Sequence, residues 1–110
     1  MMIAKEAPVR SKALRESARG RDCTLRLPGH CNGNPETSVL CHLPFGGTGM
    51  GTKVSDDHAV VACSGCHDAL DARALKKVSQ QEVLESVIRA MAETRAMWRA
   101  EGLVTYKGAK

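Results

Sequence analysis

Three short runs in the first part of the chain have the hydrophobic pattern of strands and are separated by residues that favour turns. Residues 24–27 alternate between polar and apolar side chains, and Pro28-Gly29 predicts a turn directly after them. Residues 37–43 predict a second strand. A third, apolar run at residues 59–62 leads into the sequence Cys63-Ser64-Gly65-Cys66. With a helix following, the expected core order is strand, strand, helix.

Two helices are expected in the second half of the chain. The first should run from about residue 67 to residue 77. Ser79 and Glu82 form a capping box, so a long helix over residues 79–101 should follow, and Gly102 should stop it. Its largely apolar face is expected to consist of Leu84, Val87, Ile88, Met91, Arg95 and Trp98. The pattern is typical of a packing helix, and the fold class expected for the chain is α+β.

The N-terminal segment differs from the rest of the chain in charge. Residues 1–26 hold seven basic and three acidic side chains, whereas the remainder holds nine of each. We expect residues 1–19 to form a loosely held basic arm outside the core, with a helical turn or two after Lys12, and residues 20–110 to form the folded domain. Such an arm suits a polyanion, because contacts to phosphate release counterions. A solvated terminus is the alternative.

The composition predicts a thin core and an intracellular setting. Of the 110 residues, 43% are hydrophobic and only 3% are aromatic, so a bound metal would add useful stability. No stretch approaches the roughly 18 apolar residues of a membrane span, and the N-terminus lacks the apolar run of a signal peptide. We therefore expect a cytoplasmic protein with no membrane contact. There, cysteines are better suited to metal binding than to disulfides.

Four of the five cysteines are spaced as ligands of one metal ion. Cys63 and Cys66 form a knuckle whose two sulfurs can reach one ion without straining the backbone. Cys23 and Cys31 lie further apart, but the Pro-Gly turn between them can fold the second back beside the first. We predict one structural Zn²⁺ bound by these four sulfurs. Buried free thiols are one alternative, and a site in which His30 replaces one sulfur is another.

A second group of candidate residues lies near this knuckle in the expected fold. His67 follows the knuckle directly and Asp71 lies four residues further on, so both project from one helix face and could grip a second, divalent ion. His42 ends an expected strand, and Asp56 lies in a short polar cluster before the third run. If zinc draws these segments together, His42, Asp56 and His67 could converge. A structural role for each histidine is the alternative.

This layout resembles HNH nucleases of the ββα-metal type, also called His-Me finger nucleases. Within residues 19–68, the resemblance rests on Arg-Gly-Arg-Asp-Cys, Arg-Leu-Pro-Gly-His-Cys-Asn-Gly-Asn-Pro-Glu-Thr, Val-Leu-Cys-His, Gly-Thr-Gly-Met-Gly-Thr-Lys and Ala-Cys-Ser-Gly-Cys-His-Asp. These sequences are similar to small HNH-like proteins encoded by phages and prophages. That family is similar in turn to the nuclease domain of a phage RecA-dependent endonuclease.

The resemblance implies a role for three of the candidates. His42 would be the general base that activates water, His67 would help to hold the catalytic divalent ion, and Asp56 would be a further acidic member of the site. Mg²⁺ or Mn²⁺ would suit such a mixed oxygen and imidazole site. Two positions depart from the HNH pattern: His58 stands near the place of the usual asparagine, and Cys41 precedes the expected base.

The function expected from these features is metal-dependent endonuclease activity on DNA. Low sequence specificity is expected, because no recognition helix is evident and aromatic side chains are few. Arg19, Arg21 and Lys53 are the candidate contacts to nucleic acid, and Lys53 follows a glycine-rich loop. One alternative is a catalytically weak, zinc-stabilised module that binds DNA or a recombination protein. A structural phage component is another.

Overall fold

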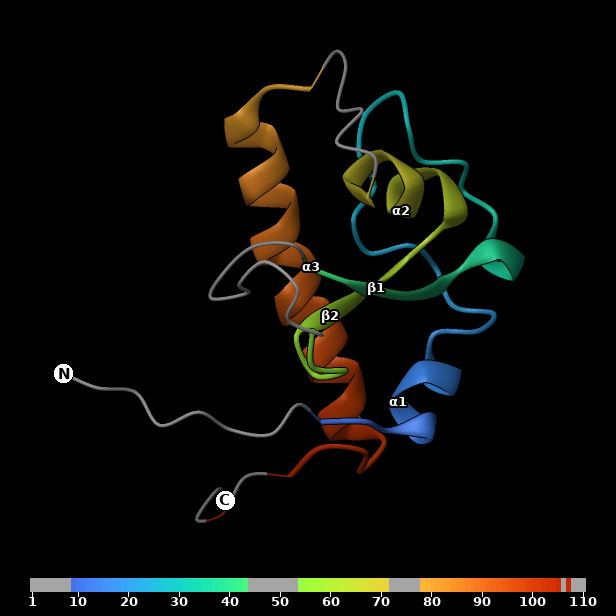
Figure 1. Ribbon diagram of the computed structural model, residues 1–110, viewed down its shortest axis with the longest axis vertical. Helices are drawn as coiled ribbons and strands as arrows, with labels where there is room; N and C mark the ends of the chain where they lie inside the picture. The colour runs from blue at the N-terminus through green and yellow to red at the C-terminus, as the bar shows by residue number, and fades with distance from the viewer. Residues whose placement is uncertain (1–8, 44–53, 72–77, 106, 108–110) are drawn as a thin grey trace, which may run out of the picture.

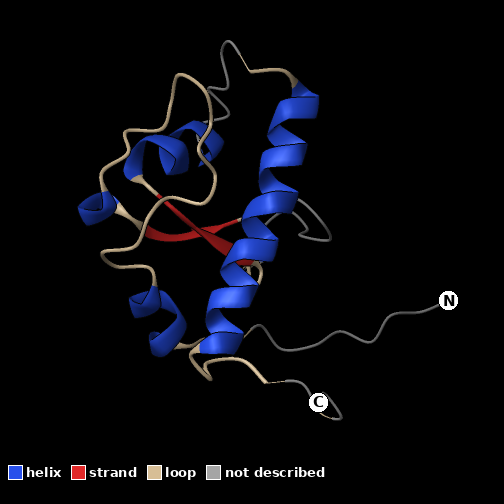
Figure 2. Ribbon diagram, turned by 180° about the vertical axis from the view of Figure 1, so that it is seen from behind, coloured by secondary structure: helices blue, strands red, loops and turns tan. Residues whose placement is uncertain are grey.

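The structure is a computed structural model that describes residues 9–43, 54–71, 78–105 and 107, with only the backbone of residue 71 (Figure 1). Its elements follow in the order α1 (Lys12–Ser17), the 3₁₀ turn η1 (Pro35–Thr37), β1 (Val39–His42), β2 (Ala59–Ala62), α2 (Ser64–Asp71) and α3 (Gln80–Ala100). Figure 2 shows α3 running along one side of a central two-stranded sheet. The predicted α+β class is confirmed. In the described part of the chain, no helix is both long and apolar enough to cross a membrane.

The antiparallel pairing of β1 and β2 separates two regions of the molecule. Val39 lies opposite Ala62, and His42 lies opposite Ala59. All four residues of β2 are buried, which accounts for its continuous apolar sequence. Since α2 begins two residues after β2 ends, the cysteine knuckle lies at the Val39 end of the sheet. His42 lies at the opposite end, about 10 Å away along the strand.

Residues 24–27 do not form the strand that their alternation predicts. The Thr24 N–H donates to the Val61 carbonyl oxygen at 2.8 Å, but Arg26 has a φ of 48°, and this left-handed conformation interrupts the extended backbone. Both leucines of the segment are nevertheless fully buried. The alternation therefore predicted the burial of the two leucines correctly and the strand pairing wrongly, and Thr24 is buried as well. β1 pairs with β2 instead, so His42 lies on the first strand of the hairpin rather than the second.

α2 begins at Ser64, before the expected start near His67, and packs closely on the turn that precedes Cys31. A Cβ atom at Gly65 would overlap the carbonyl oxygen of His30, so only glycine fits at this position. The expected continuation of this helix to residue 77 lies outside the described residues. The close approach brings the first half of the cysteine set directly against the second.

α3 begins and ends as predicted, but it buries a different face. The Ser79 Oγ accepts a hydrogen bond from the Glu82 N–H at 3.1 Å, and the helix stops before Gly102, whose φ is 71°. Leu84 and Ile88 were expected on the packed face, yet they are 45% and 67% exposed. The buried positions are Val83, Ser86, Val87, Ala90, Thr94 and Trp98. The prediction missed the small polar residues among them.

Thr94 shows why a polar side chain can be buried on this face. Its Oγ1 accepts a hydrogen bond from the Val61 N–H at 3.2 Å, and the Thr24 Oγ1 donates to the Val61 carbonyl oxygen at 2.6 Å. The backbone N–H and carbonyl groups of Val61, in β2, are thereby hydrogen-bonded by side chains from outside the sheet. A hydroxyl buried in this way ties α3 to the strand that leads into the knuckle.

α1 belongs to the core, contrary to the expectation of a loose arm over residues 1–19. The helix forms where a helical turn or two was expected, and it packs against β1. Leu14 of α1 and Ala18, directly after the helix, belong to a hydrophobic cluster whose other members are Leu40, Ala59, Val61 and Trp98. In addition, the Trp98 Nε1 donates to the Ser17 Oγ at 3.0 Å. The apolar positions of a short helix gave too weak a signal to predict this packing from sequence.

Candidate metal centre and candidate active site

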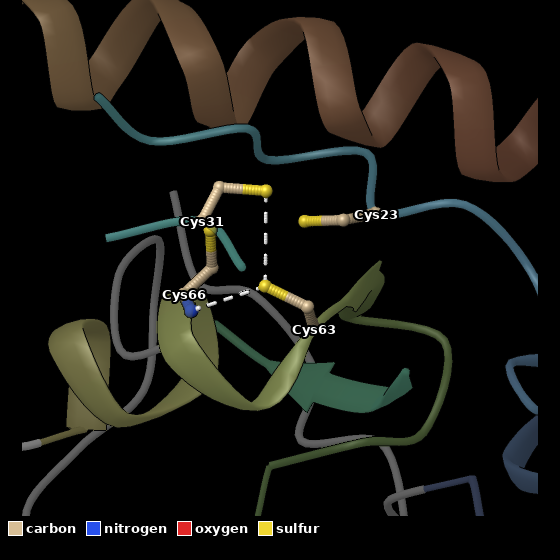
Figure 3. Close-up of side chains that lie close together, drawn as sticks. All are labelled: Cys23, Cys31, Cys63 and Cys66. Carbon is tan, nitrogen blue, oxygen red and sulfur yellow. Dashed lines mark hydrogen bonds between the residues drawn. The ribbon is translucent and has the colours of Figure 1, made fainter. Parts of the chain in front are cut away.

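The four predicted cysteines lie together in a geometry that could hold a metal ion such as zinc (Figure 3). Their Sγ atoms all lie within 4.8 Å of one another, and those of Cys31 and Cys63 are 3.8 Å apart. Four sulfurs at 2.3 Å from a tetrahedral zinc would be separated by about 3.8 Å. None of the five cysteines, all of which lie among the described residues, forms a disulfide. The predicted grouping of Cys23, Cys31, Cys63 and Cys66 is confirmed.

Two loops present these sulfurs, and each loop directs backbone N–H groups at them. The N–H groups of Arg26, Leu27 and Asn32 lie 3.4 Å from the sulfurs of Cys23, Cys66 and Cys63, respectively. The turn between Cys23 and Cys31 is closed by N–H groups of its last two residues, which donate to the Leu27 carbonyl oxygen. Such donors favour the thiolate form, which is the form that binds metal.

The pKa values of the clustered sulfurs indicate that the cluster is suited to a cation. A hydrogen bond from the Cys66 thiol lowers the pKa of Cys23 to about 4, while the same contact raises the pKa of Cys66. Burial raises the pKa of Cys31. One thiolate is therefore stabilised by its neighbours, but each further negative charge would be buried beside the first. A divalent cation would remove this repulsion, which fits the chemistry of a four-sulfur zinc site.

α3 clamps the loop that carries Cys23. The Arg26 guanidinium binds both carboxylate oxygens of Glu93, at 3.0 and 2.6 Å, and hydrogen bonding from Arg26 lowers the pKa of Glu93. The Arg89 side chain donates to the Leu25 carbonyl oxygen at 2.9 Å. The two hydrogen bonds of this pair fix the orientation of the Arg26 side chain as well as its distance from Glu93. The position of the first cysteine pair thus depends on a helix about 65 residues further along the chain.

At the other end of the sheet, His42 lies against a buried carboxylate. The His42 Nε2 is 2.8 Å from the Asp56 Oδ1, and the other carboxylate oxygen accepts from the Ser11 N–H at 2.6 Å and from Arg15 at 2.8 Å. Arg10 adds a longer contact of 3.8 Å. Asp56 is only 2% exposed, whereas the His42 side chain is 35% exposed. The imidazole is therefore held by a buried anion at Nε2 and remains partly open to solvent.

The charge of Asp56 is stabilised despite its burial. Burial by itself would raise the pKa of this carboxyl, but the hydrogen bonds, that from His42 foremost, outweigh burial and lower the pKa below its ordinary value of 3.8. An ionised carboxylate accepts a proton-bearing nitrogen, so we assign the hydrogen to the His42 Nε2. The neutral imidazole then carries its lone pair on Nδ1.

An open pocket of about 480 Å³ lies between α1 and the start of the sheet, with His42 in its wall. Its lining residues are Arg15, Arg19, Glu36, Ser38, Val39, Leu40 and His42. Two arginines and one glutamate therefore line the same pocket as a histidine that a buried carboxylate holds in place. Arg15 belongs to both arrangements, because it binds Asp56 and lines the pocket.

Comparison with known proteins places the chain in a family. The family model described as "Putative nuclease YbcO" matches residues 12–103. The chain belongs to the YbcO family. Its relative "Putative nuclease YbcO" of Escherichia coli (strain K12) is 48% identical over 92 residues, covering 83% of this chain and 95% of the relative. "Putative nuclease ybcO" of Enterobacteria phage 82 matches to the same extent.

A solved structure has the same fold. It is described as "Structure of a putative bacteriophage protein from Escherichia coli str. K-12 substr. MG1655", and it matches with a TM-score of 0.67 and 43% identity over 82% of this chain and 100% of that chain. The family match begins at the first residue of α1 and includes all four clustered cysteines, His42 and Asp56. The YbcO region therefore contains α1, in agreement with its packing in the core.

The remaining candidate residues of this YbcO-family chain have other contacts among the described residues or lie outside them. The His67 Nδ1 is 3.5 Å from the neighbouring Asp68 Oδ1. Within the described residues, only the four cysteines form a group of three or more side chains able to hold a metal. The side chain of Asp71 and all of Lys53 lie outside the described part. Arg21 binds the Ser17 carbonyl oxygen and Glu101.

The sequence did not indicate that Arg15 or Ser11 belongs to the site. Both belong to the segment expected to be a loose arm, and both bind the Asp56 carboxylate. The spacing of Arg15 and Arg19, four residues apart, was the only available signal, because such a spacing brings two side chains to the same side of a helical segment. Nothing in the sequence indicated that this side would face His42.

Proposed function

We propose that the chain is a metal-dependent endonuclease of the HNH type that hydrolyses phosphodiester bonds in DNA. The observation that carries the proposal is the His42–Asp56 hydrogen bond of 2.8 Å, which holds an accessible imidazole at the wall of an open pocket. Two further observations support it. The relatives are named as nucleases, and β1, β2 and α2 follow one another in the order of a ββα unit.

In the proposed reaction His42 acts as the general base. Its Nδ1 takes a proton from water while the water oxygen forms a bond to phosphorus and the bond from phosphorus to one sugar oxygen breaks. Asp56 positions the imidazole and stabilises its protonated form, so it acts through His42. Its carboxylate already accepts hydrogen bonds from His42, Ser11 and Arg15, which makes this role better suited to it than metal binding.

A divalent ion, Mg²⁺ or Mn²⁺, would neutralise the charge on the leaving oxygen. His67 and Asp71, both on α2, are the residues we propose to hold it, with Asp56 as a less favoured ligand for the reason given above. Zn²⁺ on the four cysteines has a structural role in this proposal, because four sulfur ligands leave no open position for water. A small enzyme of this kind would act on DNA in the cytoplasm of a bacterial cell, in phage recombination or DNA processing.

Nicking of a supercoiled plasmid tests the proposal. Wild-type protein supplied in turn with Mg²⁺, Mn²⁺ and Zn²⁺ should convert supercoiled DNA to open-circular or linear forms with at least one of them. His42→Ala should lower the rate by about 10²- to 10⁴-fold, because the general base is lost. Zinc content and the melting temperature of the variant serve as the fold control.

Three outcomes would overturn the proposed enzyme activity. Equal cleavage by wild type and His42→Ala would indicate a contaminating nuclease or a different base. Tight DNA binding by a wild-type protein that cleaves with none of the three ions would instead favour the alternative of a zinc-stabilised module that binds DNA or assists a recombination protein. Absence of both cleavage and DNA affinity would favour a structural phage component.

A further inference from the structure

We propose that the pocket between α1 and β1 binds one backbone phosphate of the nucleic acid, and that Arg15 and Arg19 are its ligands. The inference rests on the proposed function, because it names where that substrate binds beside His42. Both arginines line the same pocket as the imidazole. A phosphate held there would lie next to the general base, as hydrolysis requires.

Arg15 is fixed in place before any ligand arrives. Its guanidinium donates to the Asp56 Oδ2 at 2.8 Å, and its side chain is still 47% exposed. A guanidinium has five N–H donors in a planar fork, so one bond to a carboxylate leaves others for a phosphate oxygen. Because Arg10 also approaches Asp56, the buried charge does not cancel the charge of Arg15 completely.

Arg19 supplies the second positive charge. It is exposed at the end of α1, and among the described residues no acidic side chain forms an ion pair with it. Arg21, two residues further on, differs in this respect, because its guanidinium binds the Ser17 carbonyl oxygen and Glu101. Of the two arginines predicted to contact nucleic acid, only Arg19 therefore lines the pocket with its charge available.

Glu36 limits what the pocket can bind. Its carboxylate belongs to the same lining, on the 3₁₀ turn before β1. Together with the two arginines of the lining, it leaves a small excess of positive charge, which suits one phosphodiester better than a multiply charged terminal phosphate. Removing this carboxylate should tighten binding, whereas removing either arginine should weaken it. Because these changes in affinity are opposite in direction, together they would assign the binding to this pocket.

The test measures the affinity for a fluorescein-labelled DNA duplex by fluorescence anisotropy at several salt concentrations, without added divalent ion or chelator. Arg19→Gln should weaken binding by about five- to tenfold near 0.1 M salt and lower the slope of log affinity against log salt by about one. Glu36→Gln should strengthen binding. Arg15→Lys should weaken binding less than Arg19→Gln, because the lysine can still bind Asp56.

Lys12→Gln is the matched control. Lys12 lies on the same helix and its loss makes the same change of charge, but it is 80% exposed, pairs with Glu16 and does not line the pocket. Equal effects of Arg19→Gln and Lys12→Gln would overturn the subsite, and so would the absence of any wild-type affinity. Competition by inorganic phosphate at concentrations matching the duplex phosphate would indicate a site for free phosphate instead.

Failure of the subsite and failure of the proposed function give different results. If wild type cleaves plasmid in a His42-dependent manner but Arg19→Gln binds DNA like Lys12→Gln, the proposed nuclease activity is supported and the proposed phosphate subsite is contradicted. If wild type never cleaves but Arg19→Gln binds DNA more weakly than Lys12→Gln, the phosphate subsite stands in a protein that only binds DNA.

Discussion

The four-cysteine cluster and the His42–Asp56 pair lie at opposite ends of the same two-stranded sheet. The cluster brings together four sulfurs, and each thiolate beyond the first would lie beside another negative charge. The pair is already balanced, because the Asp56 carboxylate accepts hydrogen bonds from His42, Ser11 and Arg15. A divalent cation would therefore stabilise the cluster, whereas the pair already has its hydrogen-bond partners among the described residues.

The difference separates the two functions of a small domain. A cation on the cysteines would hold the loop of residues 23–31 to α2, and would stabilise a fold whose core has few large side chains. The His42–Asp56 pair is instead assembled by α1 and the segment around residue 55, through Val9 and Arg10 as well as Arg15. One region should therefore control stability, and the other should control activity at a smaller cost to stability.

Loss of the metal ligands should have the largest effect. Cys63→Ser should abolish zinc binding and cooperative unfolding, because structural zinc contributes on the order of 10 kcal/mol, which is comparable with the whole stability of a domain. Elemental analysis and circular dichroism measure both quantities. Cys41→Ala is the control, since this cysteine is buried outside the cluster, and it should retain about one zinc per chain. A folded, zinc-free Cys63→Ser protein would contradict the assigned role of the cluster.

Asp56→Asn should affect the His42–Asp56 pair without affecting the cysteine cluster. The amide cannot carry the charge that Arg15 and His42 face, so stability should fall by about 3 kcal/mol and cleavage by at least about tenfold. Zinc content should remain at the wild-type value. Asp57→Asn, at the exposed neighbouring position, should change neither quantity appreciably. If Asp56→Asn also lost zinc, the two ends of the sheet would not be independent.

The smallest predicted effect concerns the loop that carries Cys23. Arg26 has a φ of 48°, where glycine is less strained than any other residue. Both Arg26→Gly and Arg26→Ala lose the ion pair with Glu93, so the difference between them isolates the backbone. Urea unfolding of the zinc-loaded proteins should find the glycine variant more stable than the alanine variant by about 0.5–1 kcal/mol. A more stable alanine variant would show that the left-handed conformation is not maintained.

The sequence allowed good prediction where the signal was local. The Cys63-x-x-Cys66 spacing, the Ser79 cap and the Gly102 stop each involve residues within a few positions of one another, and each is found as expected. Prediction failed where the partner is distant. The strand expected at residues 24–27 is interrupted at Arg26, and the packed face of α3 is shifted because Ser86 and Thr94 are buried.

By itself, the sequence determined the set of candidate metal ligands, the long C-terminal helix and the candidate base, because residue type and short spacing suffice to specify them. Only the tertiary structure decided that α1 belongs to the core and that Arg15 joins Asp56 and His42 at one pocket. These contacts link positions about 15 to 80 residues apart, and the geometry around His42 and Asp56 depends on the register of β1 with β2. The pattern of residues along the chain does not by itself specify that register.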